Sequence, residues 1–386
     1  MRKIFSKIDK PLLFVGLAFL VFGLVMVLSA SSMESYMRYG SSPYYYFYRQ
    51  AIFMAVGLIA FLIVIRIPTK SYTFFSYLCM GIVIAGLIVL EVYGHIAGGS
   101  QSWFKIGSLS IQPSEFAKVI SIVFLGSYYG RKRDELGDIK ILISPLVIVL
   151  IIFGLILFQP DLGTALILGL ITCFMFFSLP MPKKILIKFR MVVLSLLVIA
   201  MGVYIITDGK ILESYQKERF NFRDPCERYQ EDSGYQLCNS FIAFKNGGLT
   251  GQGIGKSTQK YLYLPESYTD FIFPIIVEEW GALVGVLIIL IYLFIIYRLY
   301  RIARRANSLQ GSLIAYGICL YVFFHVAVNL VGVMGLAPLT GVPLPFLSYG
   351  GSYIISLMVA LGIAQRVAIE SADKQKKKIK RKGKEV

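Results

Sequence analysis

The sequence predicts an all-α, polytopic membrane protein with ten transmembrane helices, one large extracellular loop and an outer re-entrant loop. Of its 386 residues, 56% are hydrophobic and 16% are charged, and the mean hydropathy is +0.69. Soluble domains rarely reach this balance. Apolar runs of about 20 residues are long enough to cross a bilayer as helices. A closed β-barrel would instead show alternation with a period of two residues, which this sequence lacks.

Ten apolar stretches follow one another along the chain, and each is a candidate span. They cover about 11–30, 51–67, 72–94, 113–129, 141–158, 162–180, 185–207, 271–297, 312–335 and 352–369. The links between them are short except for one polar segment at about 208–270, which we expect to form the large extracellular loop. We therefore predict a single transmembrane domain over residues 1–370 and a basic cytoplasmic tail over residues 371–386.

The first apolar stretch could be mistaken for a secretory signal, because basic residues precede it and the small residues Ser29 to Ser32 end it. However, its apolar run is longer than that of a typical signal, and nine further candidate spans follow. We therefore expect a retained first helix.

The net charge of +17 raises the question of a nucleic-acid partner. With the amino terminus inside and ten crossings, most Lys and Arg residues fall on the inner side. This bias follows the positive-inside rule and predicts that both termini are cytoplasmic. Membrane topology thus accounts for the basic composition, and we expect no nucleic-acid partner. The Lys-rich tail, expected to be disordered, is either a simple anchor at anionic membrane lipids or a site for a partner protein.

Cysteine and histidine usage limits the chemistry. Cys226 and Cys238 both lie in the predicted outer loop, where they form either a disulfide or two free thiols. The chain contains only two histidines, which excludes a His-rich metal site. His325 lies inside the ninth span, and we expect it to be a hydrogen-bonded packing residue.

Ionisable side chains inside a bilayer are costly and usually mark a functional site. Those of the predicted spans gather near outer span ends: Glu91, Glu115, Lys118, Asp161 and Asp270. A site on the outer face therefore suits them better than a transport path through the membrane. Glu278 and Glu279 are the exception, because they lie deeper along the eighth span.

Two of these groups have local structural explanations that compete with a functional one. Glu115 and Lys118 follow Pro113, which suits a first helical turn, and their i, i+3 spacing lets them pair on one helix face. They either neutralise each other structurally or border a pocket and orient its contents. Asp161 follows Pro160, which ends a helix, so capping of the next helix would by itself explain this carboxylate.

A glycine-rich segment over residues 247–258 invites comparison with a phosphate-binding loop. The comparison fails because Thr250 stands where the motif requires glycine, and no strand precedes the segment. We expect its glycines to let the backbone turn tightly beside helices or approach a ligand.

The segment over residues 338–351 is apolar but interrupted by prolines and glycines. Irregular backbone at membrane depth must be buried in protein or line a wet cavity. We expect a re-entrant outer loop that forms one wall of such a cavity; the alternative is an ordinary surface loop.

Asp270 lies where the large loop enters the eighth span, and we expect that helix to begin between Thr269 and Phe271. The carboxylate is either the N-cap of the helix or a chemically active group. The helix dipole favours its ionised form, whereas apolar surroundings disfavour charge. These opposed effects suit a carboxylate that accepts a hydroxyl proton near neutral pH.

Four segments in this order resemble the SEDS family (shape, elongation, division and sporulation) of bacterial cell-wall polymerases, which contains FtsW and RodA. They are Ile111–Lys118, Gln159–Thr164, Thr258–Phe273 and Pro343–Gly351. The resemblance covers about residues 10–370. The tail and the loop over residues 208–270 favour an FtsW-like role in division over a RodA-like role in elongation.

The resemblance implies polymerisation of lipid II, a disaccharide-pentapeptide on polyprenyl pyrophosphate, into glycan strands at the outer face of the bacterial cytoplasmic membrane. It makes Asp270 the general base and Glu115 and Lys118 a functional pair. Lys256 and Lys260 are expected to hold pyrophosphate. The full set of expected substrate contacts is Gln112, Gln159, Asp161, Thr164, Lys256, Gln259, Lys260, Glu266, Ser348 and Tyr349.

The same resemblance implies partners and a cofactor. We expect two kinds of partner: a class B penicillin-binding protein, and other membrane proteins of the divisome or elongasome at sites such as the division septum. We also expect a divalent cation, Mg²⁺ or Mn²⁺, without a recognisable ligand set.

Two other functions remain open. A lipid II flippase would need a polar path, for which Glu278 and Glu279 are the best candidates. A non-catalytic scaffold for a cell-wall synthase would need no acidic catalyst.

Overall fold

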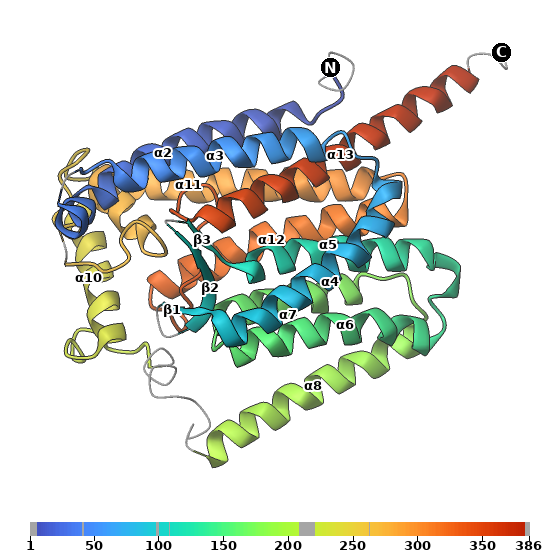
Figure 1. Cartoon of the computed structure of the whole chain (residues 1–386), viewed down its shortest axis with the longest axis horizontal. Helices are drawn as coiled ribbons and strands as arrows, with labels where there is room; N and C mark the ends of the chain where they lie inside the picture. The colour runs from blue at the N-terminus through green and yellow to red at the C-terminus, as the bar shows by residue number, and fades with distance from the viewer. Residues whose placement is uncertain are drawn as a thin grey trace.

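The computed structural model describes residues 6–40, 42–97, 100–107, 109–207, 221–261 and 263–382. Parts of the large loop (residues 208–220 and 262) and the end of the tail (383–386) lie outside these described residues. Figure 1 shows long helices lying side by side with their axes nearly parallel, with α10 and a small sheet at one end of the bundle. The start of α2 and the end of α13 lie at the other end.

The described chain is mostly helical. Its α-helices are α2 (Lys10–Tyr39), α3 (Tyr45–Val64), α4 (Thr69–Tyr93), α5 (Pro113–Arg131), α6 (Ile139–Phe158), α7 (Leu162–Phe177), α8 (Lys183–Ile206), α10 (Asp232–Gly247), α11 (Ile272–Arg305), α12 (Leu309–Val333) and α13 (Gly351–Lys382). A helix thus occupies each of the ten predicted spans. By length and apolarity, seven described helices are able to cross a membrane: α2, α3, α4, α6, α11, α12 and α13. The predicted class, a polytopic helical membrane protein, is confirmed.

Two elements differ from the sequence-based expectation. An antiparallel sheet of β1 (His95–Ala97), β2 (Ser100–Ile106) and β3 (Leu109–Ile111) fills the link between α4 and α5. The tail, expected to be disordered, continues α13 as far as Lys382, because its Lys, Gln and Arg residues are good helix formers.

Helix α12 is the central element of the bundle. It packs against α5, α7, α11 and α13, and most of its residues are buried. Polar side chains on α12 therefore meet protein atoms rather than lipid. In contrast, α8 packs on the bundle at its start, through Phe189 on Phe176; its later part diverges from the other helices in Figure 1, with exposed apolar side chains such as Val198 and Ile199.

Helix α11 is broken at Gly281, whose φ of 85° and ψ of 167° are not helical. A break in a buried helix frees backbone groups that need new hydrogen-bond partners. The carbonyl oxygens of Glu278 and Glu279, before the break, accept hydrogen bonds from Gln252 N (2.9 Å) and Gly253 N (3.0 Å). The freed acceptors are thus satisfied by the glycine-rich segment.

The same segment serves the amides beyond the break. Ala282 N donates to Gly248 O at 2.9 Å, and Leu283 N donates to Leu249 O at 3.3 Å. The backbones approach so closely that a Cβ on Gly281 would lie 2.2 Å from Leu249 O. The glycines of this segment therefore do not form a phosphate loop. They allow a tight turn whose backbone groups hydrogen-bond to those freed by the break in α11.

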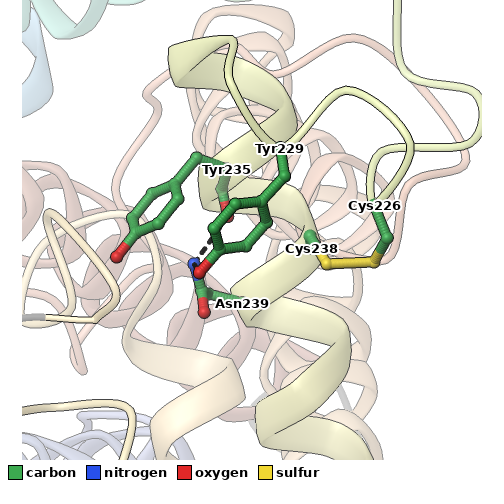
Figure 2. Close-up of a disulfide and its surroundings, with 5 residues drawn as sticks. All are labelled: Cys226, Tyr229, Tyr235, Cys238 and Asn239. Atoms are coloured by element: carbon green, nitrogen blue, oxygen red, sulfur yellow. Dashed lines mark hydrogen bonds between the residues drawn. A yellow bond between two sulfur atoms is a disulfide. The ribbon is translucent and has the colours of Figure 1, made fainter.

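The disulfide alternative for the outer cysteines is the one that the structure contains, since Cys226 and Cys238 are bonded (Figure 2). The bond fixes the chain before α10 onto α10, which in turn packs on α11. Nearby, Asn239 Nδ2 donates to Tyr235 O at 2.9 Å, and the Tyr229 and Tyr235 rings lie 4.7 Å apart between centroids.

Replacing Gly281 with alanine should destabilise the protein by about 1–3 kcal/mol, because the residue has a positive φ and no room for a Cβ. Thermal unfolding in detergent measures the effect. Gly154→Ala in α6 is the matched control, since a Cβ there meets nothing within 4 Å. Equal melting temperatures for the two variants would contradict this account of the break.

Candidate functional site

Asp270 lies at the junction between the large loop and α11. The helix begins at Ile272, and its N-cap is Phe271, which makes no side-chain capping hydrogen bond. The N-cap interpretation of Asp270 is therefore wrong, because the helix starts later in the chain than expected. Instead, Oδ1 of the half-buried carboxylate lies 3.1 Å from Thr269 Oγ1, a hydroxyl that lies closer, at 2.7 Å, to Glu266 Oε2.

The backbone that carries Asp270 is held at three consecutive carbonyl oxygens. Each accepts a hydrogen bond from a distant segment: Tyr268 O from Tyr349 N (2.8 Å), Thr269 O from Ser348 Oγ (2.5 Å) and Asp270 O from Asn329 Nδ2 (2.7 Å). Ser348 and Tyr349, both predicted substrate contacts, thus act on the backbone beside Asp270. These bonds restrict the directions in which the carboxylate can point.

Asn329 on α12 was not identified from the sequence. It is 3% exposed, and its Nδ2 also donates to Val342 O at 2.8 Å. One side chain therefore links α12, the start of α11 and the irregular segment before α13. The only sequence signal was a lone amide in an apolar span.

Three tyrosines pack around the same backbone from three parts of the chain. The ring centroids of Tyr46 and Tyr268 are 4.6 Å apart, and that of Tyr349 lies 5.1 Å and 5.7 Å from them. Burial raises the pKa of the Tyr349 hydroxyl to about 12, so this hydroxyl stays neutral at physiological pH. Gln50 on α3 adds bonds of 3.2 Å to Ser348 O and Gly350 N.

The irregular segment that these contacts fix is itself largely buried. Leu344, Phe346 and Leu347 are almost fully shielded. Burial of irregular backbone fits the expectation of a loop enclosed by protein and disagrees with an ordinary surface loop.

Glu115 and Lys118 form the expected pair inside the bundle. Lys118 Nζ lies 2.9 Å from Glu115 Oε1, and both side chains are almost completely buried. The ammonium also lies 3.0 Å from Nε2 of His325 on α12. Two charged groups and an imidazole therefore share one water-poor site, and His325 is hydrogen-bonded, as expected.

Gln112, Asp161 and Thr164 form a second polar group, between α5 and α7. Gln112 Nε2 donates to Asp161 Oδ2 at 2.9 Å, and Thr164 N donates to Asp161 Oδ1 at 3.1 Å. Asp161 is the N-cap of α7, as one of its two interpretations predicted. Gln159 lies apart from this group, since its amide donates to Leu87 O at 3.0 Å.

Lys260 is not exposed to solvent. It is 5% exposed, and its ammonium lies 2.8 Å from Glu279 Oε1 and 2.9 Å from Ser29 Oγ. This ion pair joins the large loop to α11 and α2. Lys256 is exposed, so of the two lysines expected to hold pyrophosphate it is the accessible one.

The adjacent Glu278 binds a different part of the large loop. Its carboxylate accepts hydrogen bonds from the hydroxyl of Ser257, from Thr258 Oγ1 (2.9 Å), from Asn246 Nδ2 (2.9 Å) and from Gln259 N (3.2 Å). Because both carboxylates are occupied by the loop, their depth in α11 has a structural explanation that needs no polar path across the membrane.

Glu266, another predicted contact, has an exposed side chain and a positive φ of 55°. Its Oε2 accepts from Thr269 Oγ1 at 2.7 Å, and its carbonyl accepts from Phe271 N at 3.2 Å. It thus shapes the turn that ends in Asp270.

An apolar groove of about 590 Å³ lies between α7 and α12. Leu166, Leu170, Phe323 and Val328 line it, together with Pro160 and the segment 337–340. The groove therefore adjoins the polar group of Asp161. As to metals, the described parts of the chain contain no cluster of three or more His, Cys, Asp or Glu side chains.

The predicted residues therefore fall into several groups rather than one cluster. Helix α12 connects two of them, because His325 and Asn329 are four residues apart on one helix face. His325 contacts the Glu115–Lys118 pair, and Asn329 holds Asp270.

Comparison with known proteins identifies the family. The family model described as cell cycle protein, for FtsW, RodA and SpoVE, matches residues 10–373. The chain belongs to this family. It is 38% identical to the probable peptidoglycan glycosyltransferase FtsW of Bacillus subtilis (strain 168), over 98% of this chain and 95% of that protein. It is 34% identical to stage V sporulation protein E of the same organism, over 93% and 96%.

Two solved structures share the fold. RodA of Thermus thermophilus superposes with a TM-score of 0.66 at 24% identity, over 94% of this chain and 96% of that one. A chain of a peptidoglycan synthase complex that coordinates polymerization and crosslinking superposes with a TM-score of 0.74 at 24% identity, over 94% and 98%. This FtsW/RodA/SpoVE family member is thus a multi-pass membrane protein.

Lys118→Met should destabilise the protein by about 3–5 kcal/mol, because it leaves the buried Glu115 carboxylate without its cation. Adding Glu115→Gln should recover part of this loss, since the second change removes the unpaired charge. Thermal unfolding compares the two variants. Lys132→Met, which breaks an exposed pair with Glu135, should cost less than about 1 kcal/mol. A double variant less stable than Lys118→Met would contradict the prediction.

Proposed function

We propose that this family member is a peptidoglycan glycosyltransferase that polymerises lipid II into glycan strands at the outer face of the bacterial cytoplasmic membrane. The observation that carries the proposal is Asp270, a half-buried carboxylate on a backbone fixed by three distant hydrogen bonds. Full-length relatives named as probable peptidoglycan glycosyltransferases support the same reaction.

In the proposed reaction Asp270 acts as general base. Its carboxylate accepts the proton of the acceptor sugar hydroxyl while the hydroxyl oxygen attacks the anomeric carbon of the donor. A new glycosidic C–O bond forms, and the bond from that carbon to polyprenyl pyrophosphate breaks. The held backbone serves this step because small errors in the position of a base are costly in rate.

Two other parts of the structure suit the parts of a lipid-linked sugar. The apolar groove between α7 and α12 fits part of a long apolar chain, and its size falls in the range of ligand sites. Lys256 is exposed in the large loop and would contact pyrophosphate, whereas Lys260 holds the loop in place. Mg²⁺ or Mn²⁺ would enter with the pyrophosphate, since such ions bind through substrate phosphates with few protein ligands.

The proposal extends to partners and topology. The related synthase complex coordinates polymerization and crosslinking, which supports a class B penicillin-binding protein as the partner that crosslinks. The many relatives named FtsW favour a place in the divisome at the septum. Both termini are proposed to be cytoplasmic. In line with this, the start of α2 and the end of α13 lie at the same end of the bundle (Figure 1), where Asp9 and Arg298 form an ion pair.

Asp270→Asn should abolish polymer formation from purified protein and lipid II, because the amide cannot accept the hydroxyl proton. Gel separation of the glycan products measures the effect, with and without the partner transpeptidase. Asp134→Asn, at an exposed position, is the matched control and should retain wild-type activity.

Other outcomes of this assay separate the remaining functions. Polymer from Asp270→Asn at the wild-type rate would refute the role of this carboxylate. Translocation of lipid II by the wild-type protein without polymer would identify a flippase. Growth supported by Asp270→Ala as the sole copy would identify a scaffold.

A further inference from the structure

The bundle interior contains a histidine that the proposed reaction does not use. His325 is completely buried on α12, and its ring packs against Tyr353 at 5.1 Å and Tyr321 at 4.4 Å between centroids. Aromatic packing alone would suit phenylalanine equally well at this position. The polar contacts of the ring therefore decide what the histidine contributes.

Its contacts fix the tautomer of His325. Nδ1 lies 2.8 Å from Tyr321 O, and a carbonyl oxygen can only accept, so Nδ1 carries the proton. Nε2 lies 3.0 Å from Lys118 Nζ, and an ammonium group can only donate, so Nε2 is the bare acceptor. A ring protonated at both nitrogens would point an N–H at a cation. The geometry thus requires a neutral imidazole.

This imidazole is one of two acceptors that hold Lys118. The other is Glu115 Oε1, at 2.9 Å, on the same helix as the lysine. With α5 and α12 each supplying an acceptor, the ammonium is fixed between the helices, and loss of either would let it move. The second oxygen of the carboxylate, Glu115 Oε2, is buried and accepts no hydrogen bond from the described residues.

The lysine site lies next to the support of Asp270. His325 and Asn329 are four residues apart on α12, a rise of about 6 Å. Asn329 holds Asp270 O, and Ser356 Oγ on α13 donates to Glu115 O at 2.9 Å. Through His325 and Asn329, α12 contacts both the Glu115–Lys118 pair and the backbone of the proposed base.

We propose that His325 is a positioning residue for glycosyl transfer, acting through Nε2 to hold Lys118 against Glu115. The inference rests on the proposed polymerase function. It assigns to His325 the role of a fixed hydrogen-bond acceptor rather than a packing group or a catalytic acid.

Two substitutions separate an acceptor from a packing group, because they predict opposite orders of activity. His325→Gln keeps an acceptor near the position of Nε2 but loses the ring, whereas His325→Phe keeps the ring but loses the acceptor. We expect His325→Gln to stay within about threefold of the wild-type kcat, and His325→Phe to lose about 10- to 100-fold, with KM little changed in both. Activity of His325→Phe equal to or above that of His325→Gln would overturn the proposal.

A matched control and a double variant exclude a general loss of stability. Val322→Ala removes a buried side chain of α12 without a polar contact and should retain the wild-type kcat despite a lower melting temperature. In a Lys118→Met background, His325→Phe should cause little further loss of kcat, because the contact is already absent. Fully additive losses would overturn the proposal.

A spectroscopic measurement tests the contact without any activity. The chain has two histidines, so His95→Asn leaves a single imidazole for ¹⁵N-histidine NMR of the full protein in detergent. We expect a neutral ring protonated at Nδ1. A proton on Nε2 would overturn the proposal even if Asp270→Asn proves inactive, whereas polymer from Asp270→Asn would refute the proposed function and leave the tautomer intact.

Discussion

A membrane interior supplies no water to polar groups, so each one must find its partner within the protein. This constraint explains the internal contacts of the chain. The break in α11 at Gly281 is tolerated because the segment 248–253 supplies the missing donors and acceptors. The buried Lys118 is tolerated because a carboxylate and an imidazole accept hydrogen bonds from its ammonium group. Satisfying each of these groups also fixes the geometry around it.

Helix α12 extends these restraints to the end of the bundle where Asp270 lies. Its buried polar residues Tyr321, His325 and Asn329 recur every four residues and so lie along one face. The first two hold the lysine site, and the third holds the carbonyl of Asp270 and the irregular segment before α13. In the proposed function, this support fixes the backbone of Asp270 before substrate arrives. This preorganisation is what a transfer between two bound sugars requires.

Local features were predictable from the sequence. The i, i+3 spacing of Glu115 and Lys118, the cap at Asp161 after Pro160 and the positions of the apolar spans all follow from rules that act within a few residues. The long polar loop between α8 and α11 was recognisable from its polarity, whereas the two cysteines in it left the choice between a disulfide and free thiols open.

Contacts between distant segments were not predictable. His325 contacts Lys118, and Lys260 contacts Glu279, only because distant parts of the chain pack together. A single sequence does not reveal which parts pack together. For the same reason Asn329 was overlooked and Lys260 was expected to be available for phosphate. The start of α11 was misplaced because Phe271 caps it without a side-chain hydrogen bond, which leaves no signal in the sequence.

The central claim is that the support from α12 holds Asp270 where it can act. The most direct test is the steady-state kinetics of Asn329→Leu with lipid II, since leucine has nearly the same size but cannot donate to Asp270 O. The account predicts that kcat falls about 10- to 100-fold while KM stays near the wild-type value. A folded Asn329→Leu protein with the wild-type kcat would contradict it.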